Sequence, residues 1–344
     1  MSATWSAPET RSRGDLWGIV LAGGEGVRLQ PLTRWVAGDT RPKQFCELTG
    51  PVTLLEETVR RTALLIPRDR QLLSLSRSHA PYYEPVLRRC EGVRPVVQPE
   101  NGGTALGVLY PALRVAKADP SATVAVFPSD HFIAPTDRFT EAVADATRVV
   151  ERHPHTVVLL GVLPSSPEPE YGWIEPGEPV ARGAVARRVV RFVEKPPLDI
   201  AEEMLKLGWL WNTLVVVAKV SHLVRLALTH CPDTAGPLLL ARDALGGPAE
   251  TAVVARAYAQ ARPANFSRDL LEPAHEALSV LELTGVTWSD LGTPRRVITT
   301  LVRLGAHPVW LTAQLRKELA PAVWAAEPEP AESPRPSRRL DAAS

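Results

Sequence analysis

Three glycines, Gly23, Gly24 and Gly26, follow an apolar run at 17–22, and two cations, Arg28 and Lys43, come soon after them. A glycine turn at the end of a strand lets backbone N–H groups approach a phosphate closely. The arginine and the lysine add fixed positive charge beside that turn. The spacing therefore predicts a binding site for a polyphosphate.

The glycine pattern alone does not identify the class of protein. No Gly-Lys-Ser/Thr closes the loop, so it is not a P-loop. The third glycine of a dinucleotide fingerprint is absent, because Val27, Arg28 and Leu29 follow Gly26. Pro31 comes next, and no helix is expected there. A plain glycine turn in any α/β protein remains the alternative.

A second candidate residue, Asp130, closes the apolar run at 124–129. A carboxylate at the tip of a strand can hold Mg²⁺ against phosphate oxygens. A turn aspartate or a helix N-cap has the same appearance. The residues by themselves leave both interpretations open.

Together these blocks resemble a known family. The run at 21–45, which ends in Pro-Lys-Gln-Phe, resembles the signature of sugar-1-phosphate nucleotidyltransferases, and most of all that of the mannose-1-phosphate guanylyltransferases. Further matching blocks follow in the same order at 127–131, 171–175, 192–196, 211–212 and 288–292. The resemblance implies the Rossmann-like nucleotide-diphospho-sugar transferase fold.

The resemblance also implies roles for single residues, with Mg²⁺ as the cofactor. The catalytic set would be Arg28, Lys43, Asp130, Lys195 and Asp290, of which Asp130 and Asp290 would hold the metal. Nucleotide contacts would come from Leu21, Ala22, Gly23, Gly24, Gly26, Arg28, Lys43, Gln98, Thr104 and Asp130. Sugar contacts would come from Gly172, Glu194, Lys195 and Asn212.

The reaction that the resemblance implies joins a nucleoside triphosphate (NTP) to a sugar 1-phosphate. An oxygen of the sugar phosphate attacks the α-phosphorus, and pyrophosphate leaves. GTP and mannose 1-phosphate are the expected substrates. Because a sugar phosphate is already anionic at neutral pH, the attack needs no base, and we expect a structural role for His131.

Two departures from the family pattern bear on specificity. The Arg and Asn of the family's base-reading segment align with Gly102 and Gly103. The glycine of the family's Trp-Asn-Ser-Gly block is replaced by a branched residue at Thr213-Leu214. The sequence therefore leaves both the base and the sugar open.

Short apolar runs alternate with amphipathic ones. Strands are predicted at 17–22, 71–76, 93–97, 123–128, 156–163, 187–194, 213–218 and 278–284. Helices are expected between them, with bounds assigned at 54–65, 104–118, 137–152, 198–207 and 295–304. Thr53 and Glu56 have the form of a capping box for the first of these. This alternation predicts an α/β fold with a mixed, mostly parallel sheet flanked by helices.

The charge, the cysteine count and the length of the apolar runs argue against several classes of protein. The net charge is +1, which provides no global field for nucleic acid or an anionic membrane. The three cysteines lack metal-ligand spacing, and a sparse, odd count suits a reducing cytoplasm. No apolar run approaches the length of a membrane span, and no signal peptide is expected. The oligomeric state stays open, with a homodimer as one option.

One nucleotidyltransferase domain is predicted over 15–325, between disordered segments at 1–14 and 326–344, the latter rich in proline. No second isomerase domain is expected. Two other functions remain: a non-catalytic subunit that senses a nucleotide sugar on the same fold, and a dinucleotide-dependent oxidoreductase. The missing third glycine and the charge of Arg28 count against the oxidoreductase.

Overall fold

The computed structural model describes residues 15–312, and every predicted strand is present within three residues of its expected ends. Strands β5, β7 and β11 add to the eight that were predicted. The strands are β1 (Leu16–Ala22), β2 (Gln71–Ser76), β3 (Arg94–Gln98), β4 (Thr123–Pro128), β5 (Phe132–Ala134), β6 (Val157–Val162), β7 (Gly172–Pro179), β8 (Ala186–Glu194), β9 (Leu210–Lys219), β10 (Leu278–Glu282) and β11 (Thr287–Ser289).

Nine of these strands form one twisted sheet in the order β3-β2-β1-β4-β9-β6-β10-β8-β7. The strand β1 pairs in parallel with both β2 and β4, whereas β9 runs antiparallel to β4 and β6. Within the described chain, only β8 and β9 of the nine run against the others. The predicted mixed sheet is confirmed. Seven of its nine strands share one direction, but only four of its nine pairings are parallel, because β8 and β9 pair with their neighbours in antiparallel fashion. The two remaining strands, β5 and β11, form a small antiparallel ribbon.

The helices are α1 (Gln30–Ala37), α2 (Leu54–Thr62), α3 (Ala80–Arg89), α4 (Gly103–Ala118), α5 (Thr136–Arg152), α6 (Leu198–Lys206), α7 (Val220–His230), α8 (Pro232–Leu240), α9 (Glu250–Gln260) and α10 (Pro294–Arg303). The capping box that the sequence predicts opens α2. The Glu56 N–H donates to Thr53 Oγ1 at 3.2 Å, and the Thr53 N–H donates to Glu56 Oε2 at 3.0 Å.

The expectation of no helix at Pro31 is wrong. Helix α1 begins at Gln30, and Pro31 lies in its first turn. Proline is tolerated there because the first N–H groups of a helix have no intrahelical partner, and its fixed φ already suits the helix. The helix ends at Gly38, whose φ of 80° provides the left-handed C-terminal residue.

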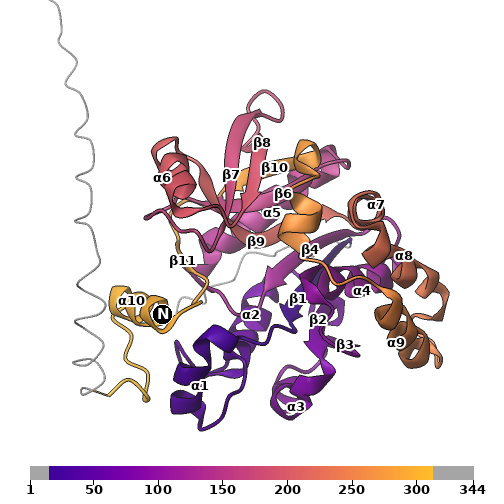
Figure 1. Cartoon of the computed structure of the whole chain (residues 1–344), viewed down its shortest axis with the longest axis horizontal. Coiled ribbons are helices and arrows are strands. Elements are labelled where there is room, and N and C mark those ends of the chain that lie inside the picture. Colours follow the sequence, from indigo (N-terminus) through magenta and orange to yellow (C-terminus); the bar gives the residue numbers. More distant parts are fainter. Residues whose placement is uncertain (1–14, 313–344) are drawn as a thin grey trace, which may run out of the picture.

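Helices cover both faces of the sheet and give the domain three layers (Figure 1). Side chains of α4, α7, α8 and α9 share one buried apolar cluster with one face of the central strands. Those of α2, α3, α5 and α6 share a second cluster with the other face. A smaller third cluster joins α1 to α10 through residues such as Leu32 and Val297, so that an early and a late helix lie side by side.

The described part of the chain, 15–312, lies within the single domain predicted at 15–325. Residues 313–325 and the predicted disordered segments at 1–14 and 326–344 lie outside it. Among the described residues, no helix combines the length and the apolar character that a bilayer crossing requires.

Candidate active site

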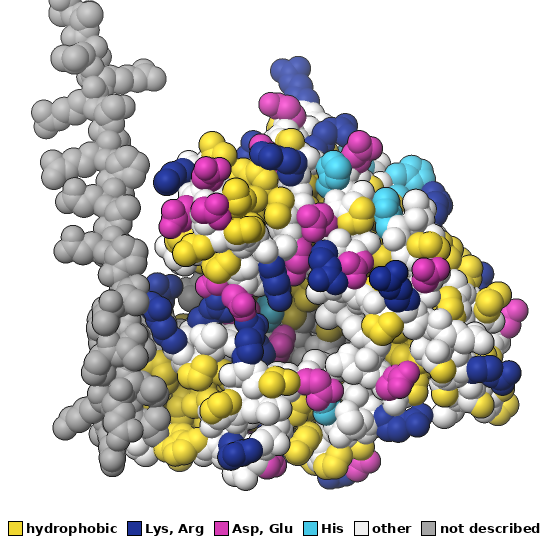
Figure 2. All heavy atoms as spheres, viewed as in Figure 1, with side chains coloured by type: hydrophobic (Ala, Val, Ile, Leu, Met, Phe, Trp, Pro, Cys, Tyr) yellow, Lys and Arg dark blue, Asp and Glu magenta, His cyan; other side chains and the backbone are white. Residues whose placement is uncertain are grey.

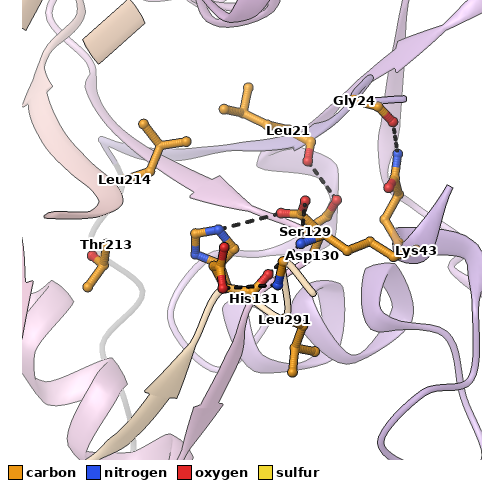
Figure 3. Close-up of polar contacts among 12 residues, drawn as sticks. Leu21, Gly24, Lys43, Ser129, Asp130, His131, Thr213, Leu214 and Leu291 are labelled. Atoms are coloured by element: carbon orange, nitrogen blue, oxygen red, sulfur yellow. Dashed lines mark hydrogen bonds and ion pairs between the residues drawn. The ribbon is translucent and has the colours of Figure 1, made fainter. Parts of the chain in front are cut away.

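The glycine loop lies at the carboxyl end of β1, next to the carboxyl end of β4. Because β1 and β4 are parallel neighbours, residues that follow them meet at one edge of the sheet. Ser129 Oγ donates to the Leu21 carbonyl at 2.6 Å and ties the two strand ends together, as Figure 3 shows. The predicted meeting of the glycine loop and Asp130 at one edge is therefore confirmed.

The loop itself is held by Gln44, which is buried. Its Nε2 donates to the carbonyls of Ala22 at 3.1 Å and Gly24 at 2.8 Å. Gly26 has a φ of 60°, and a Cβ there would lie 3.3 Å from the Lys43 backbone nitrogen. The loop therefore packs closely against the Pro-Lys-Gln-Phe segment, and this contact requires glycine at position 26.

Lys43 brings the two predicted metal ligands together. Its side chain is buried, its ammonium lies 3.4 Å from Asp130 Oδ2, and it donates to the Asp290 backbone carbonyl. Asp130 follows β4 and Asp290 follows β11, so only the fold unites these residues. Figure 3 shows the Lys43 side chain reaching Asp130 from the side of the glycine loop.

The carboxylate of Asp290 is buried and strongly bonded. Its Oδ1 accepts from the Tyr171 hydroxyl at 2.7 Å and from the Gly292 N–H at 3.0 Å, and its Oδ2 accepts from Arg296 Nη1 at 3.0 Å. Burial opposes ionisation, but the charges of Lys43 and Arg296 outweigh it and hold the pKa of Asp290 below its ordinary value. Asp290 is therefore a carboxylate at neutral pH.

His131 lies behind Asp130, with Nε2 3.7 Å from Asp130 Oδ1. Its ring packs edge-on against Trp288, and burial lowers its pKa. A neutral, buried imidazole fits the structural role expected of it. Asp130 remains partly exposed and caps no helix, since Pro135 precedes α5.

The predicted sugar residues lie together on β7, β8 and β9. Gly172 pairs with Glu194 across the β7–β8 hairpin, and a Cβ on Gly172 would lie 2.7 Å from Glu194 Oε2 and 3.3 Å from Asn212 Cβ. Burial raises the pKa of Glu194 to about 7, Lys195 opposes this shift, and Glu272 adds to it. Lys195 itself is exposed, at the strand end.

Among the described residues, three other than glycine adopt a left-handed backbone, and all three border this site. They are Lys195 with φ 54°, Leu214 with φ 61° and Leu291 with φ 48°. Such a backbone costs an ordinary residue roughly 1–2 kcal/mol, and such strain gathers at functional sites. In the block that resembles the sugar-1-phosphate nucleotidyltransferases, Leu214 occupies the position of their glycine, and its backbone is strained there. Figure 3 shows Leu214 and Thr213 across the site from Lys43.

A cavity of about 430 Å³ opens beside the glycine loop. The predicted nucleotide residues Leu21, Gly23, Gly24, Gln98 and Thr104 all line it. Ala22, Gly26, Lys43 and Asp130 do not line it. Figure 2 shows that this face of the molecule is hollowed near its centre, with cationic and anionic side chains around the hollow.

Arg28 has an acidic partner other than the two aspartates. It is half-exposed and forms an ion pair with Glu170, next to Tyr171 in the chain. Arg296 on α10 was not predicted as a site residue. It forms ion pairs with both Asp290 and Glu168, and its guanidinium lies over the Tyr171 ring. Asn265 and Arg268, which line the cavity beside the glycine loop, were not predicted either. No motif marks these residues, although Arg296 comes six positions after Asp290.

A family model described as nucleotidyl transferase matches residues 17–304 of this chain, which is most of its length. The chain belongs to the nucleotidyl transferase family. It is 28% identical over 278 residues to a putative mannose-1-phosphate guanylyltransferase of Vibrio cholerae, covering 80% of this chain and 58% of that protein. The alginate biosynthesis protein AlgA of Pseudomonas fluorescens is 30% identical, with 80% and 56% covered. The chain thus spans a little over half the length of these curated relatives.

Solved structures agree on the fold of this nucleotidyl transferase family member. A Thermus thermophilus protein described as a mannose-1-phosphate geranyltransferase superposes with a TM-score of 0.70 at 29% identity, over 83% of this chain and 79% of that one. A Helicobacter pylori protein described as a mannose-6-phosphate isomerase gives a TM-score of 0.63 at 22% identity, over 80% and 99% respectively. The second likeness supports the fold alone.

Proposed function

We propose that this chain is a nucleotidyltransferase that forms a nucleotide sugar and pyrophosphate from an NTP and a sugar 1-phosphate. The observation that carries the proposal is that the Lys43 ammonium, beside the glycine loop, contacts both the Asp130 carboxylate and the Asp290 backbone carbonyl. Anionic and cationic groups held there with few degrees of freedom suit phosphoryl chemistry, in which positioning and charge stabilisation provide most of the catalysis.

The donor set fits a magnesium ion. Mg²⁺ takes one or two carboxylates and leaves its other positions to phosphate oxygens and waters. Asp130 is partly exposed, Asp290 is ionised, and the Lys43 ammonium contacts the Asp130 carboxylate and the Asp290 backbone carbonyl. When bound, Mg²⁺ would neutralise charge on the phosphates. Lys43 and Arg28 would add cationic stabilisation of the triphosphate.

On the sugar side, Glu194 and Asn212 would bind hydroxyl groups and Lys195 would bind the sugar phosphate. We propose GTP and mannose 1-phosphate as the substrates, which is supported by the names of the relatives from Vibrio cholerae and Escherichia coli. The second of these, a mannose-1-phosphate guanylyltransferase, is 30% identical over 225 residues. A cytoplasmic location and a homodimer remain predictions.

The direct test is release of pyrophosphate from GTP, mannose 1-phosphate and Mg²⁺, followed by a panel of four NTPs against several sugar 1-phosphates. Turnover with one of these pairs is expected. Absence of turnover with every pair would contradict the proposed activity.

A second candidate is a regulatory subunit that senses a nucleotide sugar without turnover. The strained Leu214, in place of a glycine beside the sugar residues, favours this reading. The retained pair of aspartates favours the enzyme, because a sensor has no need of both. Binding of GDP-mannose without pyrophosphate release, together with co-purification with an active paralogue, would decide for the sensor.

A further inference from the structure

One wall of the nucleotide cavity comes from a segment far along the chain, 263–268, which packs against the start of α4. The Ala105 N–H donates to the Ala264 carbonyl at 3.0 Å, and the Phe266 N–H donates to Thr104 Oγ1 at 2.9 Å. A Cβ on Gly103 would lie 2.5 Å from the Ala264 carbonyl oxygen. The glycine therefore makes room for this segment.

The oxygen of each asparagine side chain in the cavity accepts a hydrogen bond from a backbone N–H. Asn101 Oδ1 accepts from the Gly103 N–H at 3.1 Å, and Asn265 Oδ1 accepts from the Arg268 N–H at 2.9 Å. A backbone N–H can only donate, so both amides are oriented without ambiguity. Each asparagine keeps its amino group, a donor, for a ligand.

The buried Gln98 is oriented by the same reasoning. Ser74 Oγ donates to the Gly107 carbonyl at 2.7 Å, which uses its only hydrogen, so it must accept from Gln98 Nε2 at 3.2 Å. The Tyr258 hydroxyl then donates to Gln98 Oε1 at 3.2 Å. One N–H of Gln98 remains, and it is again a donor.

Arg268 is the only ionised side chain among the described residues that line this cavity. Its guanidinium is exposed and pairs with Asp269, through Nε at 2.9 Å and Nη2 at 3.4 Å. A guanidinium has five N–H groups and no acceptor, so donors remain beyond this pair. The side chains around the cavity thus offer a ligand donors from Gln98, Asn101, Asn265 and Arg268.

We infer that this cavity selects bases that present a carbonyl oxygen, O6 of guanine or O4 of uracil, where adenine and cytosine present an amino group, and that Arg268 is a specificity-determining residue. The inference rests on the proposed function, since it names the base of the NTP. Guanine presents O6 and N7 as adjacent acceptors to an arginine, whereas adenine presents its amino group beside N7. That amino group would face donors and leave one of them unpaired.

The test compares kcat/KM for GTP, UTP, ATP and CTP in the wild type, in Arg268→Met and in the control Arg262→Met. Arg262 is also exposed and lies six residues away, but it does not line this cavity. In the wild type, GTP and UTP should exceed ATP and CTP. Arg268→Met should lower kcat/KM for GTP about tenfold, the value of a bidentate base contact, and change that for ATP much less. Arg262→Met should leave both unchanged.

Calorimetric binding of GDP and ADP to the same three proteins gives a readout that does not depend on turnover. GDP should bind more tightly than ADP, and Arg268→Met should reduce that difference. Equal use or binding of adenine and guanine nucleotides, or equal losses in the two arginine variants, would overturn the inference. Turnover failing with every NTP while GDP is still preferred would instead contradict the proposed function alone.

Discussion

At the scale of single residues, the site depends on cations that hold carboxylates in place. Lys43 contacts both aspartates, and Arg296 joins Asp290 to Glu168 and covers the Tyr171 ring. Each of these charges is partly or fully buried and has a partner. Removal of one partner should therefore affect stability, and only the groups that face the substrates should also affect catalysis.

Asp290→Asn tests this separation. The variant keeps an oxygen for Tyr171 and Gly292 but loses the charge, so we expect turnover to fall by about 100-fold or more, as for loss of a preorganised electrostatic contact. Arg296 keeps Glu168, so the loss in the free energy of unfolding should stay near 1–2 kcal/mol. Steady-state kinetics and urea unfolding measure the two effects.

The matched control is Glu168→Gln, which also removes a carboxylate from Arg296. It should lower stability by a similar amount and reduce turnover far less than Asp290→Asn does. Similar losses of turnover in both variants would mean that Asp290 acts only by positioning Arg296.

Glu194 should make stability depend on pH. Its pKa is about 7 in the folded protein because of burial and Glu272, with Lys195 and the more distant Arg268 opposing, against an ordinary value of 4.5. The folded state binds the proton more tightly, so this contribution is complete below about pH 4.5 and is lost as pH rises through 7. Relative to the wild type, Glu194→Gln should therefore increase the free energy of unfolding more at pH 8 than at pH 5. The difference between the two increases should be on the order of 2 kcal/mol.

Urea unfolding of the wild type and Glu194→Gln at both pH values checks this expectation. Glu175→Gln is the control, because Glu175 lies on the neighbouring strand and pairs with the exposed Arg191. A difference between the wild type and Glu194→Gln that does not change with pH would show that the carboxyl titrates normally.

At the scale of elements, the start of α4 and the segment 263–268 form one unit. Gly103→Ala would place a Cβ 2.5 Å from the Ala264 carbonyl oxygen at a φ of 86°, so both strain and overlap oppose it. Gly285→Ala carries the strain alone, because its φ is 68° and nothing lies within 4 Å of its Cβ. We expect a loss of roughly 1–2 kcal/mol for Gly285→Ala from strain and about 1–3 kcal/mol more for Gly103→Ala from overlap.

Thermal unfolding and GDP binding of the two alanine variants measure this difference. Only Gly103→Ala should also weaken GDP binding, since only Gly103 borders the cavity. Equal stability of the two variants would show that the segment can move away from α4 at little cost.

The elements that the sequence predicted well are those with a local signal. Buried strands read as short apolar runs, and α2 begins with a capping box that needs only Thr53 and Glu56. In three other helices, a proline obscures the helical pattern in the sequence. Pro31 lies in the first turn of α1, and Pro85 and Pro237 lie inside α3 and α8. No bounds were predicted for these three helices, nor for α7 and α9, which contain no proline.

Site residues that directly follow a strand could be predicted from the sequence. Asp130 and the glycine loop come directly after β4 and β1, so the topology of a parallel sheet brings them together. Asn265 and Arg268 were not predictable, because backbone contacts of Ala264 and Phe266 place them and no side-chain pattern records such contacts. Asp290 was located only through its resemblance to a known block.

At the scale of the whole molecule, the site joins distant parts of one domain. The third apolar cluster joins α1 to α10. Lys43 and Asp290, which come from opposite ends of the described chain, contact each other in the candidate active site. The two larger clusters share the same sheet. A ligand bound beside Lys43 and Asp290 would therefore contact elements from both ends of the fold, and we expect the domain to unfold in one cooperative step.

Binding of GTP with Mg²⁺ should therefore stabilise the whole domain. At a ligand concentration near 100 times Kd, the gain is about 2.7 kcal/mol, because only the folded state binds. For a domain of about 300 residues that gain corresponds to a rise in Tm of roughly 4–5 °C, in a single transition. EDTA should remove most of the rise if Asp130 and Asp290 hold the metal with the triphosphate, and Asp290→Asn should show little of it from the start. A rise that EDTA leaves intact would place the binding energy in the base cavity and the cations instead, and a second transition would show that the two ends of the fold are not coupled.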